Sequence, residues 1–110
     1  MEMDEKFISK SIAINLESHF WLIREFLGAM IKKNSGQIVS MASMAGIVGQ
    51  PDMADYCASK FGAIGLMESL RTELKKSGHS NIVCTTVSPY YINTGLFDGV
   101  KTSIFYPLLK

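Results

Sequence analysis

Two short apolar runs, separated by one long helical pattern, constrain the fold of this 110-residue chain most. The runs are residues 37–42 (QIVSMA) and residues 81–87 (NIVCTTV). Both are rich in β-branched residues and lie between turn-forming residues, as buried strands do. Two such strands joined by a helix form a βαβ unit with a right-handed crossover. The pattern therefore predicts an α/β fold containing part of a doubly wound parallel sheet.

Helical patterns occupy most of the remaining sequence. Residues 4–33 repeat apolar side chains at close to 3.6 residues, which predicts one long helix with a wide apolar face. The segment Asn34-Ser35-Gly36 ends it, with Gly36 as the expected residue after the C-cap. A second helix is expected over residues 53–76, where several glycines and alanines indicate close approach of a neighbouring backbone. Residues 96–110 show no clear period.

Composition excludes several kinds of function. The formal net charge is +1, and no cluster of Lys and Arg stands out, so we expect no nucleic-acid partner. Two cysteines, Cys57 and Cys84, have neither disulfide-framework nor zinc-ligand spacing. His19 and His79 are interpreted as ordinary helix-surface or loop residues, so no metal site is expected. No run reaches the ~20 apolar residues that span a bilayer, and the acidic start is not a secretory signal.

Three polar side chains around the first strand and the second helix suit proton transfer. Tyr56 and Lys60 are four residues apart, so they share one face of a helix. Ser43 directly follows the first predicted strand. A phenol, an ammonium and a hydroxyl in this arrangement can exchange protons with a substrate oxygen. Taken singly, each residue also suits a packing, surface or turn role.

Further motifs agree with this pattern and together resemble the classical short-chain dehydrogenase/reductase family. They are the Tyr-x-x-x-Lys signature (Tyr56 to Lys60), S-x-x-S-x-A-G (Ser40 to Gly46), I-N-L around Asn15, and P-Y-Y-I-N-T-G (Pro89 to Gly95). The match extends over nearly the whole chain. Within the family, the sequence is most similar to the branch of membrane- and lipid-droplet-associated retinol dehydrogenases and 17-beta-hydroxysteroid dehydrogenases.

The resemblance implies four catalytic residues. Tyr56 would be the general acid/base, and Lys60 would favour its phenolate and hydrogen-bond the nicotinamide ribose. Ser43 would hold and polarise the substrate oxygen. Asn15 would anchor a water that relays protons from Lys60 to solvent. If the roles do not apply, Asn15 is a polar interruption of an apolar helix face.

The resemblance also implies where a nicotinamide cofactor, NAD or NADP, would bind. Tyr56 and Lys60 would contact it, and Pro89, Ile92 and Thr94 would line the nicotinamide. The plain alternative for the last three is a turn at the end of a strand. Tyr90 departs from the family pattern, because it stands where glycine is usual.

The family's glycine-rich phosphate motif, T-G-x-x-x-G-x-G, does not occur in the sequence. Gly46 and Gly49 follow Ser43 and have no suitable helix after them. We therefore expect residues 1–110 to be the C-terminal catalytic portion of a short-chain dehydrogenase/reductase domain, which holds only part of the Rossmann-like sheet and lacks the N-terminal cofactor-binding half. The complete enzyme would have roughly 250 to 300 residues, as one large α/β domain.

The function expected from the resemblance is NAD(P)-dependent oxidation or reduction at the CH–OH group of a lipophilic alcohol or ketone, such as a retinoid or steroid. The alternative is a truncated, inactive fragment or a dimerising pseudoenzyme, since the two long helices resemble the family's dimer-forming pair. The family further implies possible membrane or lipid-droplet association, at the cytosol-facing surface of the endoplasmic reticulum or of lipid droplets.

Overall fold

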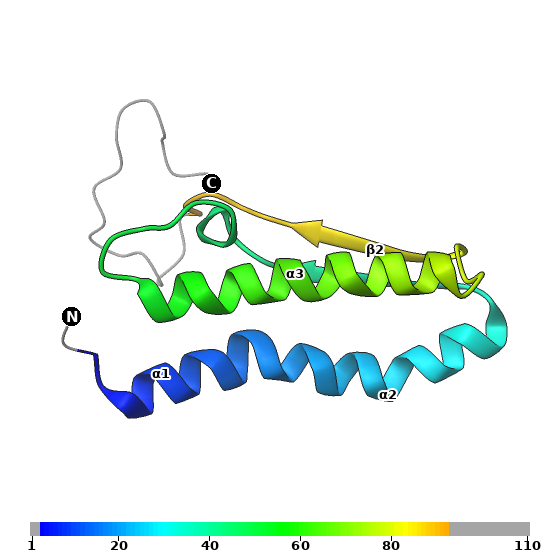
Figure 1. Cartoon of the computed structure of the whole chain (residues 1–110), viewed down its shortest axis with the longest axis horizontal. Coiled ribbons are helices and arrows are strands. Elements are labelled where there is room, and N and C mark those ends of the chain that lie inside the picture. Colours follow the sequence, from blue (N-terminus) through cyan, green and yellow to red (C-terminus); the bar gives the residue numbers. More distant parts are fainter. Residues whose placement is uncertain (1–2, 93–110) are drawn as a thin grey trace.

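A computed structural model describes residues 3–92 of the chain. Helix α1 (Glu5–Ile12), the π-helical segment η1 (Ala13–Glu17) and helix α2 (Ser18–Lys33) follow one another without a break. Strand β1 (Gly36–Met41), the 3₁₀ turn η2 (Met44–Gly46), helix α3 (Ala54–Lys76) and strand β2 (Ile82–Val87) complete the order. Figure 1 shows the α1–α2 rod running alongside α3, with the strands beyond them.

The two strands form the parallel pair that the sequence predicts. Gly36 lies opposite Ile82, and Met41 lies opposite Val87 at the other end of the register. The Ala42 amide continues the pairing by donating to the Val87 carbonyl at 2.8 Å. Because α3 connects the strands, the unit is the expected βαβ crossover, and the predicted α/β fold class is confirmed.

The core fills the space between the helices and one face of the sheet. Its buried residues are Leu70 and Leu74 of α3 and Ile82 of β2. Partly buried side chains from α2 and both strands pack against them, namely Ile23, Leu27, Met30, Ile38 and Cys84. The β-branched runs thus supply one layer of the core, and the 3.6-residue repeats supply the other.

The first helix differs from its prediction in two details. Residues 13–17 are wound as a π-helix, so the predicted single α-helix is interrupted around Asn15. Its end is capped by Asn34, in the left-handed conformation with φ 49°, and the prediction of Gly36 for this role was wrong. Asparagine tolerates left-handed backbone. Gly36 is already the first residue of β1.

Small residues at three positions allow close packing. A Cβ built on Gly36 would lie 2.6 Å from Met30, and one on Gly62 would lie 2.6 Å from Leu16. A Cβ on Gly46 would lie 2.7 Å from the backbone oxygen of Lys60. At Gly62 the close neighbour is the Leu16 side chain, so the predicted approach of a neighbouring backbone to a glycine of the second helix is not found there. Nor is it found at Gly65, which has open space around it.

We expect Gly46→Ala to destabilise the chain by about 1–3 kcal/mol, because the new methyl group meets backbone that cannot move aside alone. Gly49→Ala is the matched control, since nothing lies within 4 Å of the Cβ it would add. Thermal unfolding followed by circular dichroism measures both. Equal melting temperatures for the two variants would contradict the packing described.

Candidate functional site

The carboxyl end of β1 holds the first predicted site residue, Ser43. Its backbone is extended, with φ −168°, and its hydroxyl caps the 3₁₀ turn by accepting from the Ala45 amide at 3.1 Å. The Met44 amide donates to the Pro89 carbonyl at 2.9 Å. This bond holds the loop after β1 against the loop after β2, as adjacent parallel strands allow.

Tyr56 and Lys60 lie on the first two turns of α3 and face the same end of the sheet. The Lys60 ammonium lies 5.6 Å from the centre of the Tyr56 ring, within the range of a cation–π contact. Its Nζ donates to the Met41 carbonyl at 3.0 Å. Burial lowers the pKa of Lys60, because partial removal from water disfavours the charged form.

Asn15 is joined to this helix through Ser59, a residue that the sequence analysis did not single out. The Asn15 amide nitrogen donates to Ser59 Oγ at 3.2 Å. Ser59 is fully buried, and its hydroxyl donates to the Tyr56 carbonyl at 2.7 Å. Asn15 therefore supports the backbone that carries Tyr56. The only sign of this contact in the sequence was that a serine, Ser59, lies between Tyr56 and Lys60 in the motif.

A second contact between the same helices was also missed. Ser11 Oγ donates to Asp55 Oδ2 at 2.6 Å. This hydrogen bond lowers the pKa of Asp55, with a smaller contribution from the Tyr56 amide. A carboxylate in the first turn of α3 also complements the positive end of the helix dipole. Two hydrogen bonds thus fix the start of α3 against the first helix.

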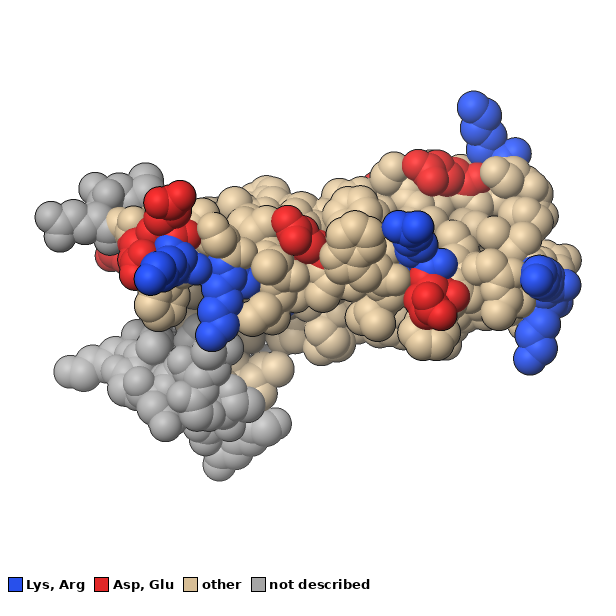
Figure 2. All heavy atoms as spheres, turned by 90° about the horizontal axis from the view of Figure 1, so that it is seen from below, with Lys and Arg blue, Asp and Glu red and all other residues tan. Residues whose placement is uncertain are grey.

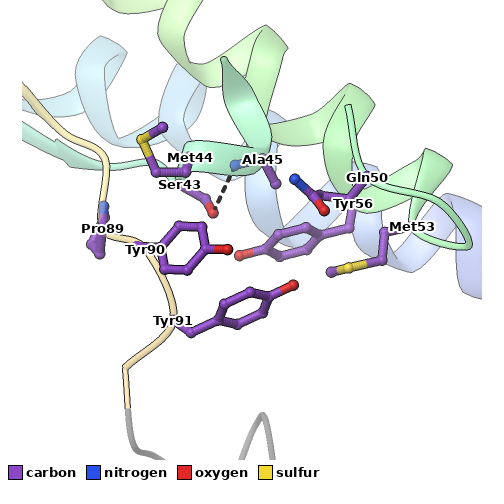
Figure 3. Close-up of a pocket in the computed structure, with 9 residues that line it drawn as sticks. All are labelled: Ser43, Met44, Ala45, Gln50, Met53, Tyr56, Pro89, Tyr90 and Tyr91. Atoms are coloured by element: carbon purple, nitrogen blue, oxygen red, sulfur yellow. Dashed lines mark hydrogen bonds between the residues drawn. The ribbon is translucent and has the colours of Figure 1, made fainter. Parts of the chain in front are cut away.

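A small cavity opens in front of these groups. Figure 3 shows the Ser43 and Tyr56 hydroxyls turned toward the same space. The cavity is about 20 Å³, and its wall consists of Ser43, Met44, Ala45, Gln50, Met53, Tyr56, Pro89, Tyr90 and Tyr91. The two rings of Tyr90 and Tyr91 meet edge to face, with centroids 4.7 Å apart. This space holds roughly one water, so a larger ligand requires lining side chains to move.

The structure brings most of the predicted site residues together. Ser43, Tyr56 and Pro89 line one cavity, and the Lys60 ammonium lies over the Tyr56 ring. Asn15 reaches the group through Ser59, and no direct Asn15–Lys60 bond is formed among the described residues. Ile92 follows the cavity wall in the chain, whereas Thr94 lies outside the described residues. The roles of these residues in turnover and cofactor binding stay predictions.

His19 was interpreted as an ordinary surface residue, and this interpretation was wrong. It is half-buried, and its Nδ1 atom is buried without a hydrogen-bond partner among the described residues. Burial lowers the pKa of the imidazole, and the positive charge of Lys60 lowers it further. No local pattern predicts this environment, because the position of Lys60 depends on the packing of α3.

Residues 3–92 contain no group of three or more His, Cys, Asp or Glu side chains that could hold a metal ion. Within the same residues, no helix is both long and apolar enough to cross a membrane.

Comparisons with known proteins identify the family of the chain. The short chain dehydrogenase family profile matches residues 1–103. Short-chain dehydrogenase/reductase family 16C member 6 of Bos taurus is 46% identical over 99% of this chain and 34% of the relative. Retinol dehydrogenase 10-B of Danio rerio is 40% identical over 100% of this chain and 34% of the relative. The chain thus spans about a third of the length of these relatives.

The fold has a close counterpart among solved structures. A 4-hydroxyisoleucine dehydrogenase complexed with NADH superimposes with a TM-score of 0.77 and 32% sequence identity. The alignment covers 86% of this chain and 41% of that dehydrogenase. The family profile extends over most of the sequence, and the shared fold is that of a nicotinamide-dependent dehydrogenase. The chain therefore belongs to the short-chain dehydrogenase family, close to its retinol dehydrogenase branch.

Proposed function

We propose that this chain is the catalytic portion of an NAD(P)-dependent oxidoreductase that acts on the CH–OH group of a lipophilic alcohol or on the corresponding ketone. The observation that carries the proposal is the meeting of Ser43, Tyr56 and Lys60 at the carboxyl end of β1. Ligands of open α/β sheets bind at this edge. The relatives reported above are named as a short-chain dehydrogenase/reductase and as a retinol dehydrogenase, which supports the proposal.

Each side chain has a distinct task in this mechanism. Ser43 hydrogen-bonds the substrate oxygen and holds it beside the Tyr56 hydroxyl, across the small cavity. Tyr56 takes the alcohol proton during oxidation and returns it during reduction. The Lys60 ammonium favours the phenolate, because a positive charge beside an acid stabilises its ionised form. Asn15 and Ser59 keep the Tyr56 backbone in place.

The residues at this edge fit the nicotinamide end of NAD or NADP. Lys60 presents an ammonium that can hydrogen-bond ribose hydroxyls, and Pro89, Ile92 and Thr94 would line the ring. The cofactor supplies hydride transfer, and the protein supplies position and charge. No glycine-rich phosphate motif occurs in this sequence, so the adenine and phosphate end requires residues beyond those of the chain.

The lipophilic substrate class rests on the cavity wall and on the relatives. Met44 and Met53 contribute thioethers, and Tyr90 and Tyr91 contribute aromatic rings. Such a wall favours an apolar body next to one hydroxyl or carbonyl. A retinoid or steroid alcohol meets this description. Membrane or lipid-droplet association, at the cytosol-facing surface of the endoplasmic reticulum or of droplets, is part of the same proposal.

Tyr56→Phe tests the acid/base assignment. The variant is best made in a chimera that joins this chain to the remainder of the bovine relative, in place of its corresponding segment. We expect kcat for retinol oxidation to fall by at least about 10²-fold, because the proton acceptor is lost. Tyr91→Phe is the matched control, with an expected change of a few-fold at most. Near-normal turnover by Tyr56→Phe, with a folded chimera, would refute the assignment.

The 110-residue chain by itself should bind NADH or NADPH too weakly to saturate at about 1 mM, because only the nicotinamide end has protein contacts. Titration followed by cofactor fluorescence measures this, and the chimera is the positive control. Saturable binding in the micromolar range by the chain alone would show that it carries a complete dinucleotide site.

A second candidate is a non-catalytic subunit that associates through its first helix. Large side chains on that helix are strongly exposed, including Phe7 (70%), Trp21 (61%) and Phe26 (56%). Figure 2 shows that uncharged side chains cover most of this face of the molecule. Large apolar side chains exposed along a helix are typical of a protein–protein contact. This candidate binds a second copy or a related dehydrogenase, and it requires no turnover.

Trp21→Glu tests this association. We expect light scattering after size exclusion to show a dimer for the unmodified chimera and a monomer for the variant, since a charge at the centre of an apolar interface is desolvated without a partner. Lys32→Glu, an exposed change near the end of the same helix, is the control and should leave the dimer intact. A monomeric parent protein would remove the second candidate.

A further inference from the structure

Two buried polar atoms lack a hydrogen-bond partner among the described residues, namely His19 Nδ1 and Ser40 Oγ. Leaving such an atom unpaired costs about 1–3 kcal/mol, so each one calls for an explanation. Ser40 is only 2% exposed. Both atoms lie close in sequence to predicted site residues, because His19 is one helical turn after Asn15 and Ser40 is three residues before Ser43.

The packing of α2 on β1 places these two residues at the same level. The two elements run in opposite directions and are in contact (Figure 1). Met30 packs against Gly36 near the turn that joins them. Going back from Met30 to His19 covers about 16 Å of helix, and going forward from Gly36 to Met41 covers about 16 Å of strand. His19 therefore lies level with the end of β1.

Lys60 reaches the same end of the strand from α3. Its Nζ is bonded to the Met41 carbonyl. Among the described residues, Lys60 is the one charged group whose field affects the His19 imidazole. Burial and this charge both lower the pKa of His19, so the imidazole is neutral at pH 7 and able to accept a proton. A neutral imidazole, a buried hydroxyl and an ammonium thus all belong to the region around the carboxyl end of β1.

The two nitrogens of His19 have different surroundings. Nδ1 is buried, whereas Nε2 is not among the buried unpaired atoms of the described residues. An imidazole can take up a proton at one nitrogen and release one from the other. The ring therefore connects the interior beside Lys60 with the outside of the helix.

We propose that His19 passes protons between Lys60 and solvent, through a water held by His19 Nδ1 and Ser40 Oγ; this inference rests on the proposed dehydrogenase function. During oxidation, hydride leaves the substrate carbon for the nicotinamide, and the hydroxyl proton goes to the Tyr56 phenolate. Lys60 releases one of its protons to the water and then takes up the proton from Tyr56. The water passes a proton to Nδ1, and Nε2 loses one to bulk water. The proton left on Nδ1 moves to Nε2 by exchange with bulk water when the ring rotates, which returns the ring to the tautomer that accepts at Nδ1.

His19 acts through Lys60 and is therefore a proton-transfer residue that does not touch the substrate. In the chimera, His19→Gln should lower kcat for retinol oxidation about 10-fold at pH 8 and leave both KM values unchanged. The ratio of parent to variant kcat should fall toward one as the pH drops, because the parent imidazole becomes protonated and stops accepting. His79→Gln, which changes the other histidine of the chain, is the matched control and should leave kcat unchanged.

Chemical rescue separates proton transfer from a structural role. Added imidazole should restore most of the lost kcat in His19→Ala, which has space for the free base. A His19→Gln variant with parental kcat and pH profile would overturn the proposal. So would a loss of kcat that is independent of pH and that imidazole does not rescue, since this is the pattern of structural damage.

A measurement that needs no catalytic turnover tests the His19–Lys60 pairing separately from the proposed function. The rate at which diethyl pyrocarbonate modifies His19, followed by mass spectrometry, reports its neutral fraction at each pH. Lys60→Met should move the midpoint upward, because the positive charge that lowers the imidazole pKa is gone. Lys60→Arg, which keeps the charge, should not move it. If the chimera is inactive, the proposed function fails, and an unmoved midpoint in Lys60→Met then overturns the His19–Lys60 pairing as well.

Discussion

The parallel pairing of β1 with β2 is the interaction on which the site depends. The register continues past the strands, through the Ala42–Val87 and Met44–Pro89 hydrogen bonds. Because of this continuation, the loop with Ser43 and the loop with Pro89 begin side by side. Hydrogen-bond donors and acceptors of the backbone must be paired when they are buried. The same requirement that orders the sheet therefore places the two walls of the cavity.

Helix α3 is positioned by small groups, and its large side chains serve mainly the core. Gly46 allows the turn after β1 to approach the Lys60 backbone. Ser59 is fully buried, yet its hydroxyl is bonded to both Asn15 and the Tyr56 carbonyl. A buried hydroxyl with two partners avoids the cost of desolvation and fixes direction as well as distance. The reactive end of the helix is therefore held by polar contacts, whereas Leu70 and Leu74 anchor the opposite end.

Much of the fold and part of the site could be predicted from the sequence. The β-branched runs and the helical periods gave strand and helix bounds within one residue, because those patterns reflect burial directly. Motif spacing identified Ser43, Tyr56 and Lys60, and the structure places them around one end of the sheet. Tertiary contacts carry no such local pattern. The Ser11–Asp55 bond and the position of His19 beside Lys60 arise only when the two helices pack together.

The π-helical turn around Asn15 has a consequence for the phase of the first helix. A π-turn closes its hydrogen bonds over five residues, where a regular turn uses four, so it accommodates one additional residue. Each residue of a regular helix advances the side-chain direction by about 100°. The extra residue at η1 (Ala13–Glu17) offsets the face of α1 from that of α2 by this angle. Ser11 and Ile23 can thereby both face α3 although the spacing between them does not fit one regular helix. The additional residue in η1 therefore allows both halves of the first helix to contact α3, the helix that carries Tyr56.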